Sequence, residues 1–207
     1  MESIILASGS PRRKTLLQQI DLTFKVQVSS VDESYDSALS GNEVVQLLAE
    51  RKARDVAQQQ QQALVIGADT IVVFNNRILE KPGSPEEARQ MLAALSGQTH
   101  QVLTGVTLCK VGNEQNIVES RTFVETTDVR FGELRSGDID RYVASGRPMD
   151  KAGSYGIQDD YGAIFVQQIE GDYYNVVGFP LHRFYNEMHR FAPEFLPNNM
   201  RNQEFEE

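Results

Sequence analysis

A short segment near the start of the sequence combines residue types that bind phosphate groups. Ile4 to Ala7 is an apolar run typical of a buried strand, and a helical pattern follows it. Ser10 is a preferred helix N-cap type, and Pro11 suits the first helical position. The N–H groups of such a helix start, next to Arg12 and Arg13, favour binding of an anion such as a phosphate chain. An ordinary capped helix with solvated arginines explains this segment alone equally well.

Two acidic residues could supply a metal ligand or a proton acceptor. Asp69 interrupts the strongest predicted strand, Leu64 to Phe74, which is otherwise apolar at nearly every position, as in a central strand. Because burying an unpaired carboxylate is costly, a functional role for Asp69 is favoured over that of a core acid bonded to backbone N–H groups. Glu33 lies in a polar loop after a predicted strand at Phe24 to Val28, where an acid is usually just solvated.

Three lysines lie where a cation could bind an anion. Lys52 falls on the apolar stripe of a helix that we predict to be capped by Asn42 and to run to about Gln58. Its side chain either extends along the apolar surface to water or faces a cleft, and the spacing favours neither. Lys81 lies in a loop after a predicted short strand. Lys151 opens a polar loop that includes Gln158, with groups suited to a phosphate or a base edge, although a connecting loop is the simpler interpretation of that segment alone.

The overall composition restricts the partners. The 29 acidic residues outnumber the 20 Lys and Arg residues, and the formal net charge is −9. We therefore expect no nucleic-acid partner, although a nucleotide needs only a few local cations. One cysteine, Cys109, excludes an internal disulfide and a cysteine-rich zinc site, and the three histidines lack metal-ligand spacing. Since no signal-peptide pattern or membrane-length apolar run is present, we expect a cytoplasmic protein without a membrane partner.

Alternating helical and strand patterns predict an α/β protein. Further expected elements are a helix after the capping box at Ser84, long antiparallel strands at His100 to Val111 and Ile117 to Phe131, a short helix from about Gly137 to Ala144, a strand at Ala163 to Ile169 and a helix from Pro180 to Phe191. We expect residues 1–192 to form one domain and residues 193–207, rich in Asn and Glu, to form an acidic, disordered tail.

The polar segments belong to a series of short motifs that follow one another in a specific order. The motifs are L-A-S-G-S-P-R-R at 6–13, Glu33, E-R-K-A at 50–53, G-A-D-T-I-V at 67–72, E-K-P at 80–82, L-S-G-Q-T-H at 95–100 and D-K-A-G-S-Y-G-I-Q at 150–158. This series resembles the Maf family of nucleoside triphosphate pyrophosphatases. The resemblance extends from Ile4 to about Phe184, and several motifs in the right order are far more specific than any one of them.

The resemblance implies a fold and a reaction. The fold is α/β and Maf/ITPase-like: a twisted mixed sheet with flanking helices and two lobes around a central cleft. Such enzymes cleave a nucleoside triphosphate between the α and β phosphates, giving a monophosphate and pyrophosphate, with a divalent cation such as Mg²⁺ or Mn²⁺.

The resemblance also implies a role for each site residue. The expected roles are proton acceptor (Asp69), further catalytic group (Glu33, Lys52, Lys81), metal ligand (Glu33, Asp69), substrate binding (Ser8, Arg13, Lys151) and base selection (Arg12, Thr70, Gln158). The base-selecting set resembles that of members directed at dTTP and UTP, whereas 7-methyl-GTP-directed members carry an aromatic residue after the proline and Gln after the aspartate. The chain departs from the family where Asp159-Asp160-Tyr161 precede Gly162, which puts the shape of the base-side loop in question.

Two alternatives to this function remain open at the level of the sequence. A non-catalytic nucleotide sensor that regulates septum formation would bind nucleotide without turnover. Asp69 and Glu33 favour the enzyme, because a sensor needs no base. Within the enzyme class, the substrate could instead be a modified pyrimidine triphosphate. The family tends to form homodimers, so we also consider a dimer, although the sequence shows no interface signature.

Overall fold

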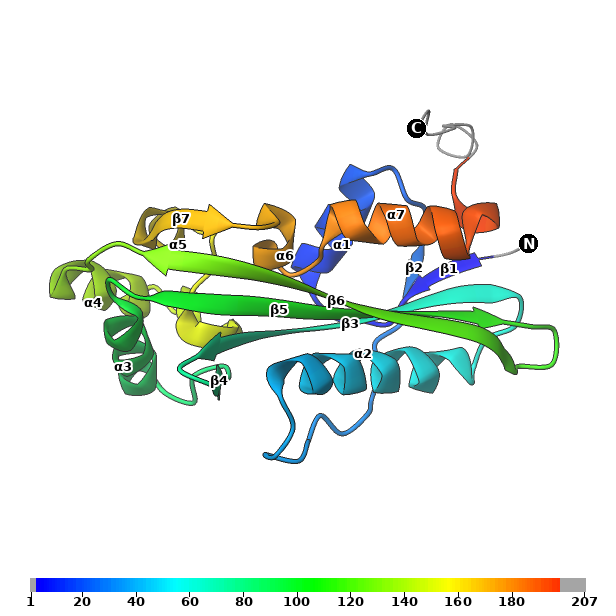
Figure 1. The fold of residues 1–207 in the computed structure, drawn as a ribbon, viewed down its shortest axis with the longest axis horizontal. Helices are drawn as coiled ribbons and strands as arrows, with labels where there is room; N and C mark the ends of the chain where they lie inside the picture. The colour runs from blue at the N-terminus through cyan, green and yellow to red at the C-terminus, as the bar shows by residue number, and fades with distance from the viewer. Residues whose placement is uncertain (1–2, 198–207) are drawn as a thin grey trace. The chain divides into compact units, whose positions relative to one another are not determined.

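The structure, a computed structural model, describes residues 3–197 (Figure 1). Within them, seven strands form one mixed sheet in the order β2-β1-β3-β5-β6-β7, with β4 beside β3. The helices and strands are β1 (Ser3–Leu6), α1 (Pro11–Gln19), β2 (Lys25–Val26), α2 (Gly41–Ala57), β3 (Ala63–Phe74), β4 (Arg77–Leu79), α3 (Pro85–Leu95), β5 (Thr99–Val111), β6 (Ile117–Phe131), α4 (Ser136–Ala144), α5 (Asp160–Phe165), β7 (Val166–Glu170), α6 (Tyr173–Val177) and α7 (Leu181–Phe191). The predicted α/β class with a mixed sheet and flanking helices is confirmed.

The described chain divides into two compact units, and the division falls inside the three longest strands. Unit 1 contains residues 3–69, 105–124 and 179–197, and unit 2 contains residues 70–104 and 125–178. Asp69 and Thr70, adjacent in β3, therefore belong to different units. The cleft expected between two lobes stays a prediction.

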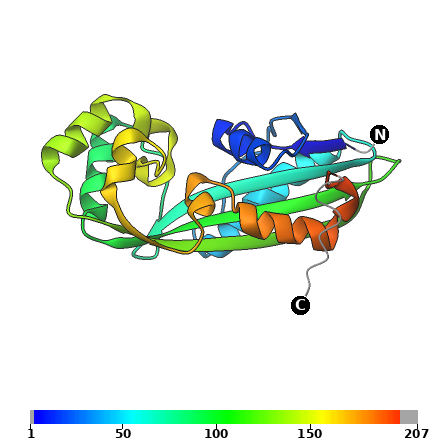
Figure 2. The ribbon, with the colours of Figure 1, turned by 90° about the horizontal axis from the view of Figure 1, so that it is seen from above.

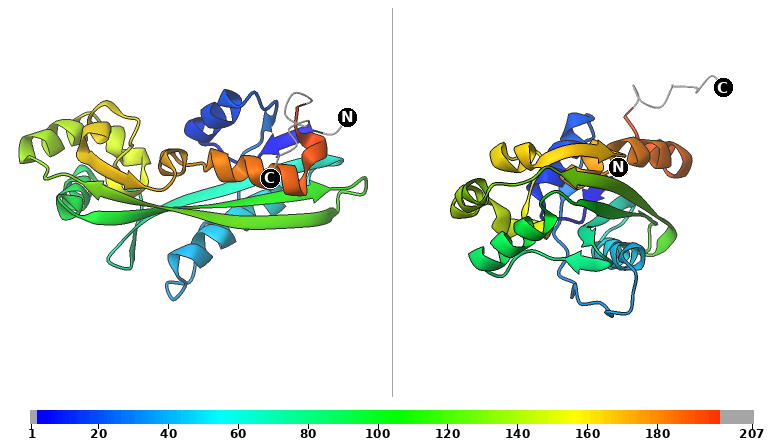
Figure 3. Two further views of the ribbon diagram at one scale, coloured as in Figure 1. Left: turned by 45° about the horizontal axis from the view of Figure 1, so that its top comes forward. Right: turned by 60° about the vertical axis from the view of Figure 1, so that its left-hand side comes forward.

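In unit 1, helix α2 packs directly against the backbones of β3 and β5. A Cβ atom built on Gly67 would lie 2.3 Å from the carbonyl oxygen of Ala49, and one on Gly105 would lie 2.3 Å from that of Val45. Only glycine allows such an approach. Helix α7 covers the opposite face of the sheet in this unit (Figures 1 and 3). The two glycines therefore fix the distance between α2 and the strand that carries Asp69.

Strand β1 pairs in parallel with both β2 and β3, with Leu6 opposite Val26 and Ile66. Ser40, not the predicted Asn42, caps α2. Its hydroxyl accepts from the Glu43 N–H at 3.4 Å, and the Glu43 carboxylate accepts from the Ser40 N–H at 2.8 Å. This reciprocal pair is a capping box, which places the helix cap two residues earlier than predicted.

In unit 2, helices α3, α4 and α5 surround an aromatic core and cluster together in Figure 2. Tyr142 and Phe165 are fully buried and meet edge to face, with ring centroids 5.4 Å apart. Phe131 on β6 contacts Tyr155 in the same manner at 4.8 Å. Such pairs stabilise a core beyond the area that they bury. They anchor the loop that contains Tyr155.

Two boundaries near the C-terminal end differ from the sequence predictions. The expected strand at Ala163 to Ile169 is wrong in its first half. The N–H of Ala163 donates to the Asp159 carbonyl at 2.8 Å and starts helix α5, so the strand begins only at Val166. The expected tail begins with ordered residues, since Pro193–Phe195 form a 3-10 turn and Leu196 is buried. The rest of the predicted tail, residues 198–207, lies outside the described residues.

No helix in the described part of the chain is both long enough and apolar enough to cross a membrane.

Candidate active site

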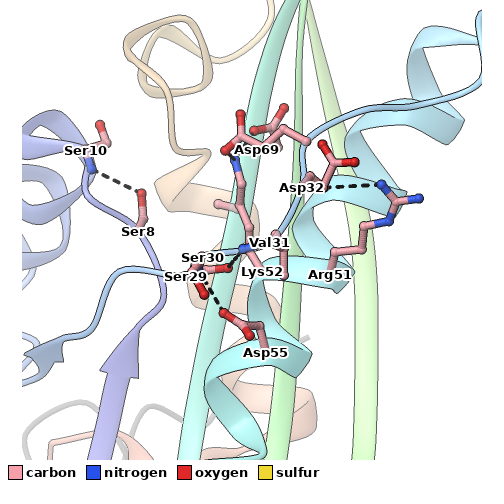
Figure 4. Close-up of polar contacts among 12 residues, drawn as sticks. Ser8, Ser10, Ser29, Ser30, Val31, Asp32, Arg51, Lys52, Asp55 and Asp69 are labelled. Atoms are coloured by element: carbon pink, nitrogen blue, oxygen red, sulfur yellow. Dashed lines mark hydrogen bonds and ion pairs between the residues drawn. The ribbon is translucent and has the colours of Figure 1, made fainter.

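The turn between β1 and α1 is held by its own serines and by a buried arginine. The Ser10 side chain accepts from the Arg13 N–H, and the Ser8 hydroxyl accepts from the Ser10 N–H at 3.2 Å (Figure 4). The Arg13 guanidinium donates to Ser8 Oγ at 3.1 Å and to the Ala68 carbonyl at 2.8 Å. The predicted cap at Ser10 is confirmed, and Arg13 joins this turn to β3 directly before Asp69.

Arg13 is a buried cation next to an anion. It is 8% exposed, and burial lowers the pKa of its guanidinium, while the neighbouring Asp69 carboxylate opposes that shift. An arginine nonetheless stays charged in a protein. The site therefore contains a fixed positive charge near the Asp69 carboxylate.

Lys52 connects the two predicted acids. Its ammonium lies 2.6 Å from Asp69 Oδ1 and 2.8 Å from Glu33 Oε1. The Lys52 and Asp69 side chains are each 12% exposed, whereas that of Glu33 is 61% exposed. The head of Lys52 faces the two carboxylates and is largely buried, so it does not extend to water, and binding of a ligand by Lys52 stays a prediction. Asp69 is held by an ammonium instead of by backbone N–H groups.

The loop that carries Glu33 is braced by residues on both sides of Lys52 along α2. Arg51 donates to the Ser34 carbonyl at 2.6 Å. Asp55 accepts from the Ser30 N–H at 3.0 Å, as Figure 4 shows. Within the loop, two hydrogen bonds from Ser34 lower the pKa of Asp32. Sequence reasoning missed Arg51 and Asp55. No local sequence signal indicates these contacts, because they depend on the path of the Glu33 loop across α2.

The other predicted site residues, apart from the half-buried Arg12 on α1, belong to unit 2. The Thr70 hydroxyl lies 2.9 Å from that of Thr104 and donates to the Gly178 carbonyl at 3.3 Å. Lys81 and Gln158 are exposed. The Gly153 N–H donates to the Glu80 carbonyl at 3.2 Å, which brings the E-K-P loop and the loop after Lys151 together.

The chemistry of the donor set suits a small, hard divalent cation. Among residues 3–197, no three His, Cys, Asp or Glu side chains gather in one place, so the acidic pair Glu33 and Asp69 is the candidate. Mg²⁺ in nucleotide sites commonly uses one or two carboxylates together with substrate phosphate oxygens. The pair therefore fits such a metal.

Fold and site together define an α/β protein in which a hydrogen-bonded strand-to-helix turn lies beside a lysine-linked pair of carboxylates. The chain belongs to the Maf family, since the family model described as "Maf-like protein" matches residues 3–191. It is 50% identical to a dTTP/UTP pyrophosphatase of Halalkalibacterium halodurans over 197 residues, which cover 94% of this chain and 100% of that protein. It is 49% identical to a dTTP/UTP pyrophosphatase of Bacillus cereus (strain B4264) over 191 residues, 92% of this chain and 96% of the relative. The predicted family membership is confirmed.

Proposed function

We propose that this protein is a nucleoside triphosphate pyrophosphatase that hydrolyses dTTP and UTP to the monophosphate and pyrophosphate. One observation carries the proposal most directly: Lys52 joins Asp69 and Glu33 next to the buried Arg13. Support also comes from the high identity, over nearly the whole chain, to enzymes named dTTP/UTP pyrophosphatase.

The cations of the site bind the phosphate chain. Arg13 and Ser8 present donors at the start of α1, where backbone N–H groups and the helix dipole also favour an anion. Lys52 and Lys81 supply further charge. Since the protein is acidic overall, binding depends on this local group of cations and not on a general positive field.

Asp69 accepts the proton of the attacking water. The water oxygen bonds to the α-phosphorus, the bond from that phosphorus to the bridging oxygen breaks, and pyrophosphate leaves. Lys52 contacts Oδ1 of Asp69, so we assign Oδ2 as the atom that takes the proton. Lys52 also orients the carboxylate through its 2.6 Å contact with Oδ1.

Glu33 and Asp69 would hold the divalent cation, Mg²⁺ or Mn²⁺. When bound, such a cation offsets the negative charge of the phosphates and of the pyrophosphate that leaves. Glu33 is exposed and lies on a braced loop, so it can meet a cation that arrives with the nucleotide.

The base is selected by Arg12, Thr70 and Gln158. A modified pyrimidine triphosphate is the alternative substrate for the same reaction. Four other expectations stay predictions: the cytoplasmic location, the homodimer, the absence of a nucleic-acid partner, and residues 1–192 as the catalytic domain.

Product analysis tests the proposed reaction. Purified protein is incubated with a panel of nucleoside triphosphates, with Mg²⁺ or Mn²⁺ and then with chelator. We expect dTTP and UTP to give monophosphate and pyrophosphate only when metal is present. Inorganic phosphate and a diphosphate as products would mean that another bond is cleaved. Tight nucleotide binding without turnover would favour a non-catalytic nucleotide sensor over an enzyme.

A further inference from the structure

Lys151 is a buried lysine whose ammonium, among residues 3–197, contacts oxygens of its own unit only. Its side chain is 10% exposed, and Nζ lies 2.6 Å from the Arg147 carbonyl, 2.7 Å from Asp150 Oδ1 and 3.0 Å from Asp159 Oδ2. An ammonium has three N–H donors, and three protein oxygens engage them. A phosphate could bind this lysine only by displacing one of them.

Asp159 extends this contact into the aromatic core. Its Oδ2 also accepts from the Tyr142 hydroxyl at 3.0 Å, and that hydroxyl accepts from the Gly156 N–H at 3.2 Å. Tyr142 is fully buried against Phe165, so its hydroxyl has a fixed position. Burial raises the pKa of Tyr142, which keeps the hydroxyl protonated as a donor. The chain of contacts from Lys151 through Asp159 to Tyr142 and Gly156 is named here the Lys151 network.

The loop is packed tightly around the Lys151 network. A Cβ atom on Gly156 would lie 2.7 Å from Lys151 Cε, and one on Gly162 would lie 2.2 Å from the Gly156 carbonyl oxygen. Gln158 is exposed, but the residues before and after it in the sequence have fixed positions. Ile157 is buried, and Asp159 belongs to the Lys151 network. The structure thus fixes the backbone at Gln158 and leaves its side chain available to a ligand.

We propose that Lys151 is a positioning residue rather than a phosphate ligand, and that Lys151, Asp159 and Tyr142 hold Gln158 in place to select the pyrimidine base. This inference rests on the proposed function. It changes the role expected for Lys151 from the sequence. It also gives a purpose to Asp159, which lies where the chain departs from the family pattern.

Three variants test the Lys151 network. Lys151→Met removes the ammonium but keeps an unbranched chain of nearly the same length, and Asp159→Asn keeps the shape of the aspartate side chain. Asp150→Asn is the matched control, because Asp150 contacts the same ammonium but its side chain is 62% exposed. For each variant, kcat/KM is measured with dTTP, dCTP, dATP and dGTP. Competitive inhibition by inorganic pyrophosphate, which has no base, reports phosphate binding separately.

We expect Lys151→Met and Asp159→Asn to reduce the preference for dTTP over the other nucleotides by about tenfold, because the first removes the buried hydrogen bonds of the ammonium and the second removes the negative charge that strengthens them. The inhibition constant for pyrophosphate should stay within about twofold of wild type, and Asp150→Asn should resemble wild type.

Two results would overturn the inference. Weaker pyrophosphate inhibition, with an equal loss for every nucleotide, would make Lys151 a phosphate ligand. An unchanged nucleotide preference in both variants would leave the Lys151 network without a role in base selection. If Lys151→Met does not fold, Asp159→Asn decides alone, because it preserves the volume of the side chain. Failure of the proposed function is seen separately, since wild-type protein would then release no pyrophosphate.

Discussion

At the scale of single residues, the candidate active site is a balance of opposite charges at short range. One ammonium lies within 2.8 Å of two carboxylates, and the buried Arg13 guanidinium lies close to Asp69. The buried Asp69 carboxylate can act as a base only if a water reaches it. This arrangement leads to two predictions about individual side chains.

Asp69→Asn tests the proton acceptor. The amide keeps the shape of the carboxylate and can still accept from Lys52, so the fold should be retained. Because an amide cannot take a proton from water, kcat for dTTP should fall by about 10²–10⁴-fold. Glu50→Gln, which alters an exposed ion pair on the same helix as Lys52, is the control and should keep wild-type kcat. An Asp69→Asn enzyme with wild-type kcat would disprove the assignment.

The adjacent arginines Arg12 and Arg13 allow phosphate binding and base selection to be separated. Arg13 is buried and bonded to Ser8 and Ala68, so Arg13→Ala should lower kcat/KM for all nucleotides alike. Arg12 is half-buried, and Arg12→Ala should instead change the order of preference among dTTP, UTP, CTP and GTP. Steady-state kinetics with each nucleotide provides the comparison. An unchanged order after Arg12→Ala would remove this residue from the specificity set.

At the scale of elements, the site depends on how closely α2 approaches the sheet. The helix backbone meets β3 at Gly67 and β5 at Gly105. Lys52 directly precedes Ala53, which contacts Gly67, so the close approach brings Lys52 to Asp69 on the same strand. Local sequence signals cannot show this approach, because it depends on residues far apart in the chain. A glycine inside a strand pattern indicates only that some backbone comes close.

Gly67→Ala tests the contact between α2 and β3. The added methyl group would overlap backbone atoms of α2, which cannot move without displacing the helix. We expect a loss of about 1–3 kcal/mol in the free energy of unfolding, together with lower kcat as Lys52 shifts from Asp69. Denaturant unfolding and turnover of dTTP measure the two effects. Gly132→Ala is the matched control, since a Cβ there meets no atom within 4 Å. Equal stability of both variants would contradict this account.

Capping and periodicity predicted most elements, because these signals are local. Ser10 with Pro11 marked the start of α1, and the apolar run from Leu64 to Phe74 marked β3. The apolar residues after Gly162 were assigned to a strand because periodicity cannot distinguish one helical turn from a short strand.

The site was predicted less completely than the elements. Motif order identified Asp69, Glu33 and Lys52 as candidates, but the spacing left the direction of the Lys52 side chain open. The contacts of Arg51 and Asp55 with the Glu33 loop depend on its path across α2, for which the sequence contains no local signal.

At the scale of the whole molecule, stability should depend on pH through a buried histidine in unit 2. His100 is 2% exposed, its Nε2 lies 2.8 Å from the Tyr155 hydroxyl, and its ring meets Phe131 edge to face. Among the described residues, its Nδ1 has no hydrogen-bond partner. The site thus accommodates a neutral imidazole and disfavours a charged one.

Replacing His100 tests this dependence on pH. Burial lowers the pKa of His100 from 6.5 to about 4, so between these values the unfolded chain binds a proton that the folded protein does not. The free energy of unfolding should therefore decrease as the pH falls from about 7 to 4, by up to about 3 kcal/mol from this residue. The glutamine side chain of His100→Gln cannot titrate. The difference in the free energy of unfolding between wild type and His100→Gln therefore isolates the histidine, because all other groups are shared. In urea unfolding at several pH values, the advantage of wild type over His100→Gln should shrink as the pH falls. Tyr155→Phe, the control, retains the buried imidazole and should keep the wild-type dependence of the free energy of unfolding on pH. If the free energies of wild type and His100→Gln instead changed in parallel with pH, His100 would be protonated equally in the folded and unfolded states.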